Sequence, residues 1–228
     1  MDWKGDYGVE VKDCAVLCYA EGCISATIEP MNSVNETRPI DAAAIGPSGN
    51  IFLVGMMGAG KTTIGKSLAG LLGKTFFDSD REIQKRTGVG IPVIFEIEGE
   101  EGFRKRETEM LRELVNLKNI VLATGGGAVL SQENRNLLRD NGTVIYLRAT
   151  VDHLWRRTRN DKNRPLLQTP DPRATMSEIY SQRDPVYCEA AHIVVENGEQ
   201  GSYQLTRSLA DQLMGTDSGI NRMDDEDV

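Results

Sequence analysis

The sequence contains no apolar run that approaches the roughly 20 residues needed for a membrane-spanning helix. Its first six residues lack the basic and apolar stretches of a secretory signal peptide. An excess of basic residues is also missing, because 26 Lys and Arg stand against 34 Asp and Glu. These absences argue against membrane proteins, secreted proteins and general nucleic-acid binders, and we expect a cytoplasmic protein.

Cysteine and histidine are scarce, with four and two residues in the whole chain. Cys14, Cys18 and Cys23 lie close together, but their spacing matches no common zinc pattern and neither histidine is nearby in sequence. Without a secretory signal, free thiols are the default, although a zinc site with a fourth, distant ligand stays open as the alternative.

The acidic charge of the chain is confined to its two ends. Residues 1–49 carry three basic against eight acidic side chains, and residues 215–228 carry one against five. The segment 50–214 is left with a net charge of +1. The terminal segments are polar and show no sustained periodicity, so we expect 1–49 and 215–228 to be largely disordered around one folded domain, 50–214.

A glycine-rich loop, Gly55–Thr62, follows the apolar run 51–54 and precedes a helical pattern. Its spacing, G-x-x-x-x-G-K-T, is that of a phosphate-binding loop in the strand–loop–helix context this motif requires. Glycines let several backbone N–H groups converge on a polyphosphate, and the helix adds its positive dipole end. We therefore expect Lys61 to reach the β- and γ-phosphates and the Thr62 hydroxyl to bind Mg²⁺. The nucleotide-binding residues of this loop would be Gly58, Ala59, Gly60, Lys61, Thr62 and Thr63.

Hydrophobic periodicity predicts five short strands that alternate with helices. The strands are expected at 51–54, 75–78, 119–123, 143–147 and 192–196. The helices are expected at 61–72, 81–86, 93–97, 99–117, 134–140, 151–159, 173–189 with a break at Pro185, and 202–214. This alternation indicates an α/β protein with a parallel sheet covered by helices on both faces. A ligand would then bind at the carboxyl ends of the strands.

The second predicted strand ends in Asp78 and Asp80, whose spacing points both carboxylates the same way. In many phosphate-loop enzymes, a carboxylate at the end of an apolar strand assists the Mg²⁺ ion. The apolar strand 119–123 ends in glycines instead, so Asp78 and Asp80 are the best source of such a carboxylate. We expect Asp78 near the metal and Asp80 as the general base or orienter of an attacking hydroxyl. The alternative for Asp80 is that it caps the helix that starts at Arg81, and the two roles are compatible.

Glycines and arginines complete the predicted strand-end chemistry. Gly125, Gly126 and Gly127 would let a small substrate lie close to the backbone, or would only form a flexible connection. Arg104, Arg164 and Arg183 could bind a carboxylate bidentately, although each taken singly is more often a surface charge. No histidine or cysteine ends a predicted strand, so no covalent intermediate is needed.

With these motifs together, the segment from Asn50 to Met214 resembles the shikimate kinase family. The motifs that carry the resemblance are the loop from Gly55 to Thr63, F-D-S-D at 77–80, I-F at 94–95, G-F-R at 102–104, the glycines 125–127, R-P-L-L at 164–167 and R-D-P-V-Y at 183–187. The resemblance implies a nucleoside-monophosphate-kinase-like P-loop fold, a three-layer α/β/α sandwich with a five-stranded parallel sheet. It also implies ATP as co-substrate with one Mg²⁺ ion, and phosphorylation of the 3-hydroxyl of shikimate in aromatic amino-acid biosynthesis.

The resemblance also assigns residues to roles. It implies that shikimate is held by Asp80, Arg104, Gly126, Gly127 and Arg183, with Phe95 and Phe103 as the apolar wall. Glu107 would hold Arg104 in place, Thr62 and Asp78 would serve the metal, and Arg157 would lie beside adenine. Arg164 would be the lid arginine that closes over the phosphates. In the expected adenine loop, residues 197–200 lack the basic residue that some relatives have.

The predicted reaction is direct transfer of the γ-phosphoryl group of MgATP to a hydroxyl of shikimate, with Lys61, Asp80 and Arg164 as the catalytic residues. The loop 160–172 would be a lid that excludes water. We expect a monomer with no nucleic-acid or membrane partner. Two alternatives stay open: a related kinase of another small acid such as gluconate, and a regulatory module that binds a nucleotide without turnover.

Overall fold

The computed structural model describes residues 49–161, 165–198 and 201–215. The expectations of disorder for 1–49 and 215–228, and those for the three N-terminal cysteines, fall almost entirely outside the described residues. Among the described residues, no helix combines the length and apolar character needed to cross a bilayer.

Five parallel strands form one sheet in the order β2-β3-β1-β4-β5. They are β1 (Asn50–Val54), β2 (Thr75–Asp78), β3 (Ile120–Ala123), β4 (Gly142–Arg148) and β5 (Ile193–Glu196). The central strand β1 is buried along its whole length, and its Phe52 lies level with Leu122 of β3 and Val144 of β4. The short apolar runs of the sequence are therefore the strands of a buried parallel sheet, as predicted.

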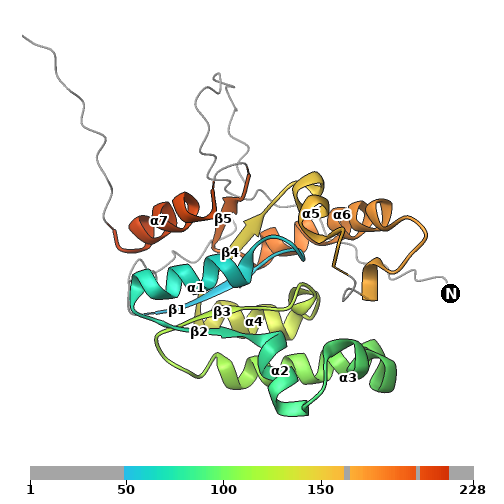
Figure 1. Cartoon of the computed structure of the whole chain (residues 1–228). Coiled ribbons are helices and arrows are strands. Elements are labelled where there is room, and N and C mark those ends of the chain that lie inside the picture. Colours follow the sequence, from blue (N-terminus) through green and yellow to red (C-terminus); the bar gives the residue numbers. More distant parts are fainter. Residues whose placement is uncertain (1–48, 162–164, 199–200, 216–228) are drawn as a thin grey trace, which may run out of the picture.

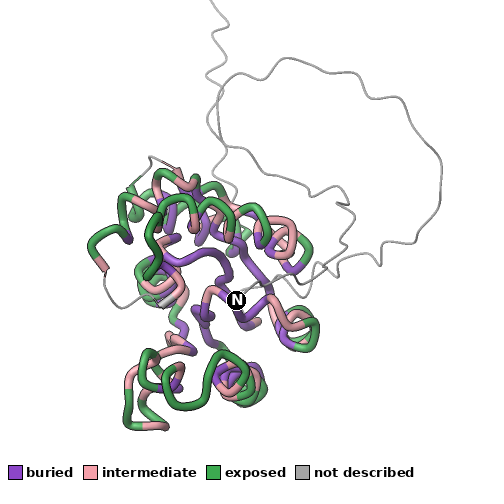
Figure 2. The backbone as a smooth tube through the Cα atoms, turned by 90° about the vertical axis from the view of Figure 1, so that its right-hand side faces the viewer, coloured by how far each residue is buried: buried purple, intermediate pink, exposed green. Residues whose placement is uncertain are grey.

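Helices cover both faces of this sheet and give three layers (Figure 1). On one face lie α1 (Lys61–Leu72) and α7 (Ser202–Leu213), which pack against each other. On the other lie α4 (Gln132–Asn141) and α6 (Pro172–Ala190), with α3 (Ile91–Leu114) beside α4. The central strands β1, β3 and β4 form the buried centre of the molecule, and the outward faces of the helices are exposed (Figure 2). The predicted α/β/α architecture with a five-stranded parallel sheet is confirmed.

Two smaller helices extend the edges of the sandwich (Figure 1). At the β2 edge, α2 (Ser79–Thr87) packs on α3, and at the far side α5 (Val151–Thr158) packs on α6. Two short 3₁₀ helices lie at Ala128–Leu130 and at Pro165–Leu167. The second of these occupies part of the predicted lid, whose residues 162–164 fall outside the described chain.

The capping role considered for Asp80 belongs instead to Asp78. Asp78 has extended backbone and its Oδ1 accepts a hydrogen bond of 3.2 Å from the backbone N–H of Arg81. Asp80 lies inside the first turn of α2, two residues too late to cap it. The alternative in which Asp80 caps the helix is therefore wrong, because α2 starts at Ser79 rather than at Arg81.

Several other element boundaries differ from the prediction by one or more residues, and two differences in the helices have a clear cause. The helix expected to reach Leu117 ends at Leu114, because the Asn50 side chain donates to the carbonyls of Val115 and Leu117 and holds them in a turn. Pro185 does not break α6, which is continuous to Ala190. Asp184 and Tyr187, on either side of this proline, are both tied to neighbouring elements, and these contacts outweigh the local cost of proline.

Candidate active site

The carboxyl ends of the parallel strands meet at one edge of the sheet, where the loop after β1 wraps the start of α1. Gly60 precedes this helix with φ at 89°, a left-handed conformation that strongly favours glycine. Among the described residues, no side chain caps the first N–H groups of α1, and its first turn carries no acidic side chain. The N–H groups and the dipole of α1 are therefore arranged as an anion site.

Lys61 folds back over the start of this loop. Its Nζ donates to the carbonyl oxygens of Gly55, at 2.7 Å, and Met56, at 3.0 Å. The ammonium group is thus held at the mouth of the loop, at the position from which a lysine can contact a bound polyphosphate.

Thr62 and Asp78 come together as the sequence predicts. The Thr62 hydroxyl donates to Asp78 Oδ2 at 2.8 Å, which joins the first turn of α1 to the end of β2. Two oxygen ligands of the kind that Mg²⁺ prefers therefore lie next to each other beside the anion site. Among the described residues, no group of three or more His, Cys, Asp or Glu side chains could hold a metal ion by itself.

Asp80 lies across the glycine turn from Glu107. A Cβ placed on Gly125 would lie 2.8 Å from Asp80 Oδ1 and closer still to Glu107 Oε1, so any side chain here would displace one of the two carboxylates. The backbone N–H of Gly125 donates to the buried Ser79 hydroxyl at 2.9 Å, which fixes the turn against α2. The triple glycine is therefore a packed turn that faces two carboxylates. The alternative interpretation, a flexible connection, is wrong.

Glu107 is fully buried and forms an ion pair with Arg104. Its Oε2 accepts a hydrogen bond of 2.8 Å from Arg104 Nη1. Burial raises the pKa of Glu107 to about 7, opposed by the charges of Arg104 and Arg183 and reinforced by that of Asp80. The Glu107 carboxyl group therefore accepts the hydrogen bond of Arg104, while burial favours its protonated, neutral form.

Arg104 lies against the glycine turn and the aromatic side chains. A Cβ on Gly127 would lie 2.5 Å from Arg104 Cζ, so the guanidinium group rests directly on this glycine. It also lies 5.4 Å from the ring centre of Phe103, which packs at 4.8 Å against Phe95. The Nη2 of Arg104 donates to Glu100 at 2.9 Å. The predicted apolar wall and the predicted anion-binding arginine are therefore contiguous.

Arg183 reaches the same turn from α6 on the other side. Its Nη1 donates to the Gly126 carbonyl at 3.2 Å, and the Tyr187 hydroxyl donates to the same oxygen. Arg183 is 8% exposed, so it is not the solvated surface charge of the alternative interpretation. The structure brings Asp80, Arg104, Gly126, Gly127 and Arg183 together around one turn, as the sequence predicts.

The nucleotide side of the site is only partly described. Arg157 donates from α5 to the Gly58 carbonyl at 3.3 Å, which places it beside the phosphate loop. Asn197, which follows β5, donates to the Ala59 carbonyl at 2.6 Å from a buried position. Arg164, predicted as the lid arginine, lies outside the described residues.

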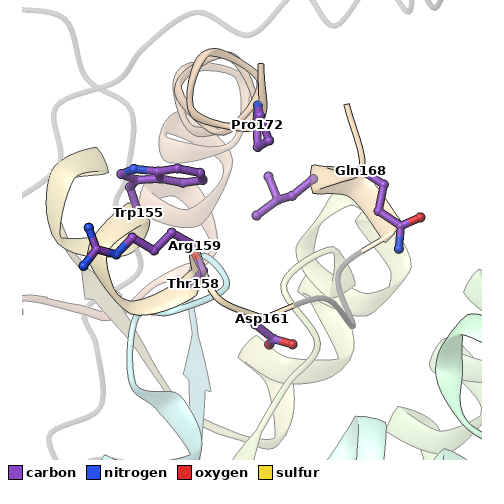
Figure 3. A pocket seen from close by; sticks show the side chains of 7 residues that line it. Trp155, Thr158, Arg159, Asp161, Gln168 and Pro172 are labelled. Atoms are coloured by element: carbon purple, nitrogen blue, oxygen red, sulfur yellow. The ribbon is translucent and has the colours of Figure 1, made fainter. Parts of the chain in front are cut away.

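A cavity of about 360 Å³ lies at the predicted lid segment rather than at the glycine turn (Figure 3). Trp155 of α5 and Arg159, which directly follows this helix, line one side, and Leu167, Gln168 and Pro172 line the other. The residues predicted to bind the acceptor do not line it. The cavity therefore lies between the end of α5 and the start of α6, and residues of the predicted lid segment contribute to its lining.

Four residues for which the sequence indicates no role contact the site in the structure: Ser79, Glu100, Tyr187 and Asn197. Asn197 could have been found, because it directly follows a strand end. Tyr187 is the last residue of the R-D-P-V-Y motif, but its sequence position gives no sign that its hydroxyl reaches Gly126, 61 residues away. Contacts of this kind depend on the packing of α6 against the sheet.

Comparison with known proteins shows the family to which this chain belongs. The family model described as "Shikimate kinase" matches residues 57–214. The shikimate kinase of Nitrosospira multiformis is 70% identical over 166 residues, which cover 73% of this chain and 85% of that protein. The shikimate kinase of Nitrosomonas europaea is 62% identical over 177 residues, with coverage of 78% and 83%.

Solved structures agree with the sequence comparison. The structure of shikimate kinase from Acinetobacter baumannii in complex with shikimate matches with a TM-score of 0.73 at 46% identity, covering 78% of this chain and 99% of that one. The structure of shikimate kinase from Aquifex aeolicus matches with a TM-score of 0.65 at 34% identity, covering 75% of this chain and 99% of that one.

Proposed function

Because this chain belongs to the shikimate kinase family, we propose that it phosphorylates shikimate through the residues gathered at the carboxyl edge of its sheet. Its reaction is that of the family: the γ-phosphoryl group of ATP is transferred to shikimate, and ADP and shikimate 3-phosphate are formed. We assign roles in this reaction to individual residues on the basis of their positions and their side-chain chemistry.

The single observation that supports the acceptor site best is the convergence of Asp80, Arg104 and Arg183 on the glycine turn 125–127. Two guanidinium groups approach this turn from α3 and α6, which suits a single carboxylate bound between them. Asp80, on the β2 side of the turn, offers an acceptor for ring hydroxyls. A carboxylated ring with several hydroxyls matches this set in both charge and hydrogen-bonding character.

Thr62 and Asp78 fit the Mg²⁺ ion that accompanies ATP. Their oxygens are hard ligands, they lie 2.8 Å apart, and the adjacent N-terminus of α1 receives the phosphates. Mg²⁺ typically binds through one or two protein oxygens together with substrate phosphates, so a larger acidic cluster is not required. When bound, the ion would neutralise charge that develops on the phosphates.

The protein's own contribution is positioning and charge stabilisation. Lys61 moves from the loop carbonyls to the phosphates and stabilises the negative charge on the transferring group. Asp80 orients the attacking hydroxyl and accepts its proton as the new P–O bond forms and the bond to ADP breaks. Arg104 and Arg183 hold the acceptor carboxylate, which fixes the distance and angle of attack.

Arg164 and the lid 160–172 would complete the site by closing over the phosphates and excluding water, the competing acceptor. Phe95 and Phe103 would form the apolar wall beneath the ring, and Arg157 would lie beside adenine. A cytoplasmic location, a monomeric state and the domain limits 50–214 stay predictions.

A coupled assay of ADP release tests this assignment. We expect turnover to depend on shikimate, with no comparable turnover on gluconate or on nucleoside monophosphates. A related kinase would instead prefer one of the other acceptors, and a regulatory module would bind ATP with no acceptor-dependent turnover at all.

Arg183→Ala should raise the KM for shikimate about 100-fold or more, because a charge-assisted, bidentate contact is lost, while the KM for ATP stays within about twofold. The exposed Arg112→Ala on α3, which loses an ion pair with Glu133, serves as the matched control and should leave both KM values unchanged. An unchanged shikimate KM in Arg183→Ala would show that the carboxylate binds elsewhere.

A further inference from the structure

Tyr187 lies one helical turn after Arg183 on α6, and the two side chains share one acceptor. The Arg183 Nη1 donates to the Gly126 carbonyl at 3.2 Å, and the Tyr187 hydroxyl donates to the same oxygen. The Gly126 peptide is therefore held against α6 by two donors from two different side chains.

The Tyr187 side chain has no route to a substrate, because it is completely buried. Its ring stacks on Tyr146 of β4 with centres 4.8 Å apart, and its hydroxyl lies 3.8 Å from the sulfur of Met56 at the start of the phosphate loop. Burial raises the pKa of Tyr187 to about 12, so the hydroxyl stays a donor throughout the physiological pH range.

Holding the Gly126 carbonyl also fixes the N–H of the next residue. The peptide unit between Gly126 and Gly127 is planar and trans, so its N–H points opposite to its carbonyl oxygen. With that oxygen turned toward α6, the Gly127 N–H is directed away from α6. The backbone of Gly127 in turn supports the Arg104 guanidinium, since any Cβ there would collide with it.

We propose that Tyr187 is a positioning residue for the acceptor substrate: its hydroxyl holds the Gly126 peptide and thereby sets both the glycine turn and the guanidinium group of Arg183. This inference rests on the proposed function, because it takes Gly126, Gly127 and Arg183 as the substrate-binding groups. Without the Tyr187 hydroxyl, the Gly126 peptide is held only by the hydrogen bond from Arg183 and can rotate. The Gly126 carbonyl oxygen then no longer has a fixed position, and the Arg183 guanidinium group that donates to it loses its orientation.

The test is Tyr187→Phe, with Tyr146→Phe as the matched control. Each variant removes one buried hydroxyl from the same stacked ring pair, but the Tyr146 hydroxyl donates to Asp184 at 2.8 Å and does not contact the glycine turn. We expect Tyr187→Phe to raise the shikimate KM about tenfold, the order expected for one buried hydrogen bond, with the ATP KM within about twofold. Tyr146→Phe should leave both KM values unchanged, because Asp184 keeps its two hydrogen bonds to Arg148 and α6 stays anchored.

Two outcomes would overturn the proposal. One is a wild-type shikimate KM in Tyr187→Phe, and the other is an equal rise in both tyrosine variants, which would indicate a general loosening of the ring pair. If Tyr187→Phe is too unstable for steady-state kinetics, the shikimate concentration that half-saturates its thermal stabilisation gives the same comparison.

Arg183→Ala separates this proposal from the proposed function. If Arg183→Ala raises the shikimate KM and Tyr187→Phe does not, only the positioning role is wrong. If Arg183→Ala has no effect, the substrate assignment itself fails. In the double variant, the effects on the shikimate KM should be less than multiplicative, because Tyr187 acts partly through Arg183.

Discussion

The buried carboxyl group of Glu107 should make the stability of this protein depend on pH in a measurable way. Glu107 is fully buried, its Oε2 is bound by Arg104, and its Oε1 has no hydrogen-bond donor among the described residues. Burial raises its pKa from 4.5 to about 7. A glutamate that must ionise in such a place destabilises the folded state.

The sign of the pH dependence follows because the folded protein holds the proton of Glu107 more tightly than the unfolded chain does. Between pH 4.5 and pH 7 the unfolded chain has released this proton while the folded protein still retains it, so the free energy of unfolding falls as pH rises. The shift in pKa corresponds to about 3 kcal/mol, present in full below pH 4.5 and lost above pH 7. Glu107→Gln keeps the shape and an acceptor for Arg104 but cannot titrate.

Urea unfolding at several pH values between 4.5 and 8 measures this effect. The stability of the wild type minus that of Glu107→Gln should decrease by about 3 kcal/mol across the range. The exposed Glu109→Gln on the same helix is the control, and its curve should run parallel to the wild type. If the Glu107→Gln curve also runs parallel to the wild type, Glu107 is ionised throughout and the reasoning about its burial is wrong.

Three further predictions concern the phosphate, metal and acceptor sites. Lys61→Ala should lower kcat by about 100-fold or more in the coupled assay, because one donor to the transferring group is lost; a kcat near that of the wild type would remove Lys61 from the mechanism. Asp78→Asn should raise the Mg²⁺ concentration needed for half-maximal activity about tenfold while α2 stays intact, since Asn also caps helices; an unchanged Mg²⁺ requirement would place the metal elsewhere. Gly127→Ala should displace Arg104 and raise the shikimate KM by about 10- to 100-fold, whereas Gly70→Ala, which meets no atom within 4 Å, should not; equal KM values would refute the close packing of Arg104 on the turn.

Much of the fold could be predicted because its signals are local. An apolar run such as 51–54 has the length and composition of a buried strand, and the glycine spacing that follows it is specific to a phosphate loop. Ligands of parallel α/β sheets bind at the carboxyl ends of the strands, and this rule predicts that Asp78, Asp80 and the triple glycine share one edge of the sheet. These residues lie at that edge in the structure.

The remaining features depend on packing between distant segments. Pro185 looks like a helix break by its local chemistry, but Asp184 is bound by Tyr146 and by two nitrogens of Arg148, and this anchoring keeps α6 continuous. The cap of α2 is Asp78 rather than Asp80, and the sequence alone does not distinguish them because it leaves the first residue of that helix open. Tyr187 shows the same limit for the site, since its partner is 61 residues away.

A crystal structure of the protein with MgADP and shikimate bound would show directly which residues hold the acceptor. We predict that the shikimate carboxylate lies between the guanidinium groups of Arg104 and Arg183, that Asp80 contacts a ring hydroxyl, and that the metal lies beside Thr62 and Asp78. A carboxylate bound away from both arginines, or a ring that does not reach the glycine turn, would contradict the account.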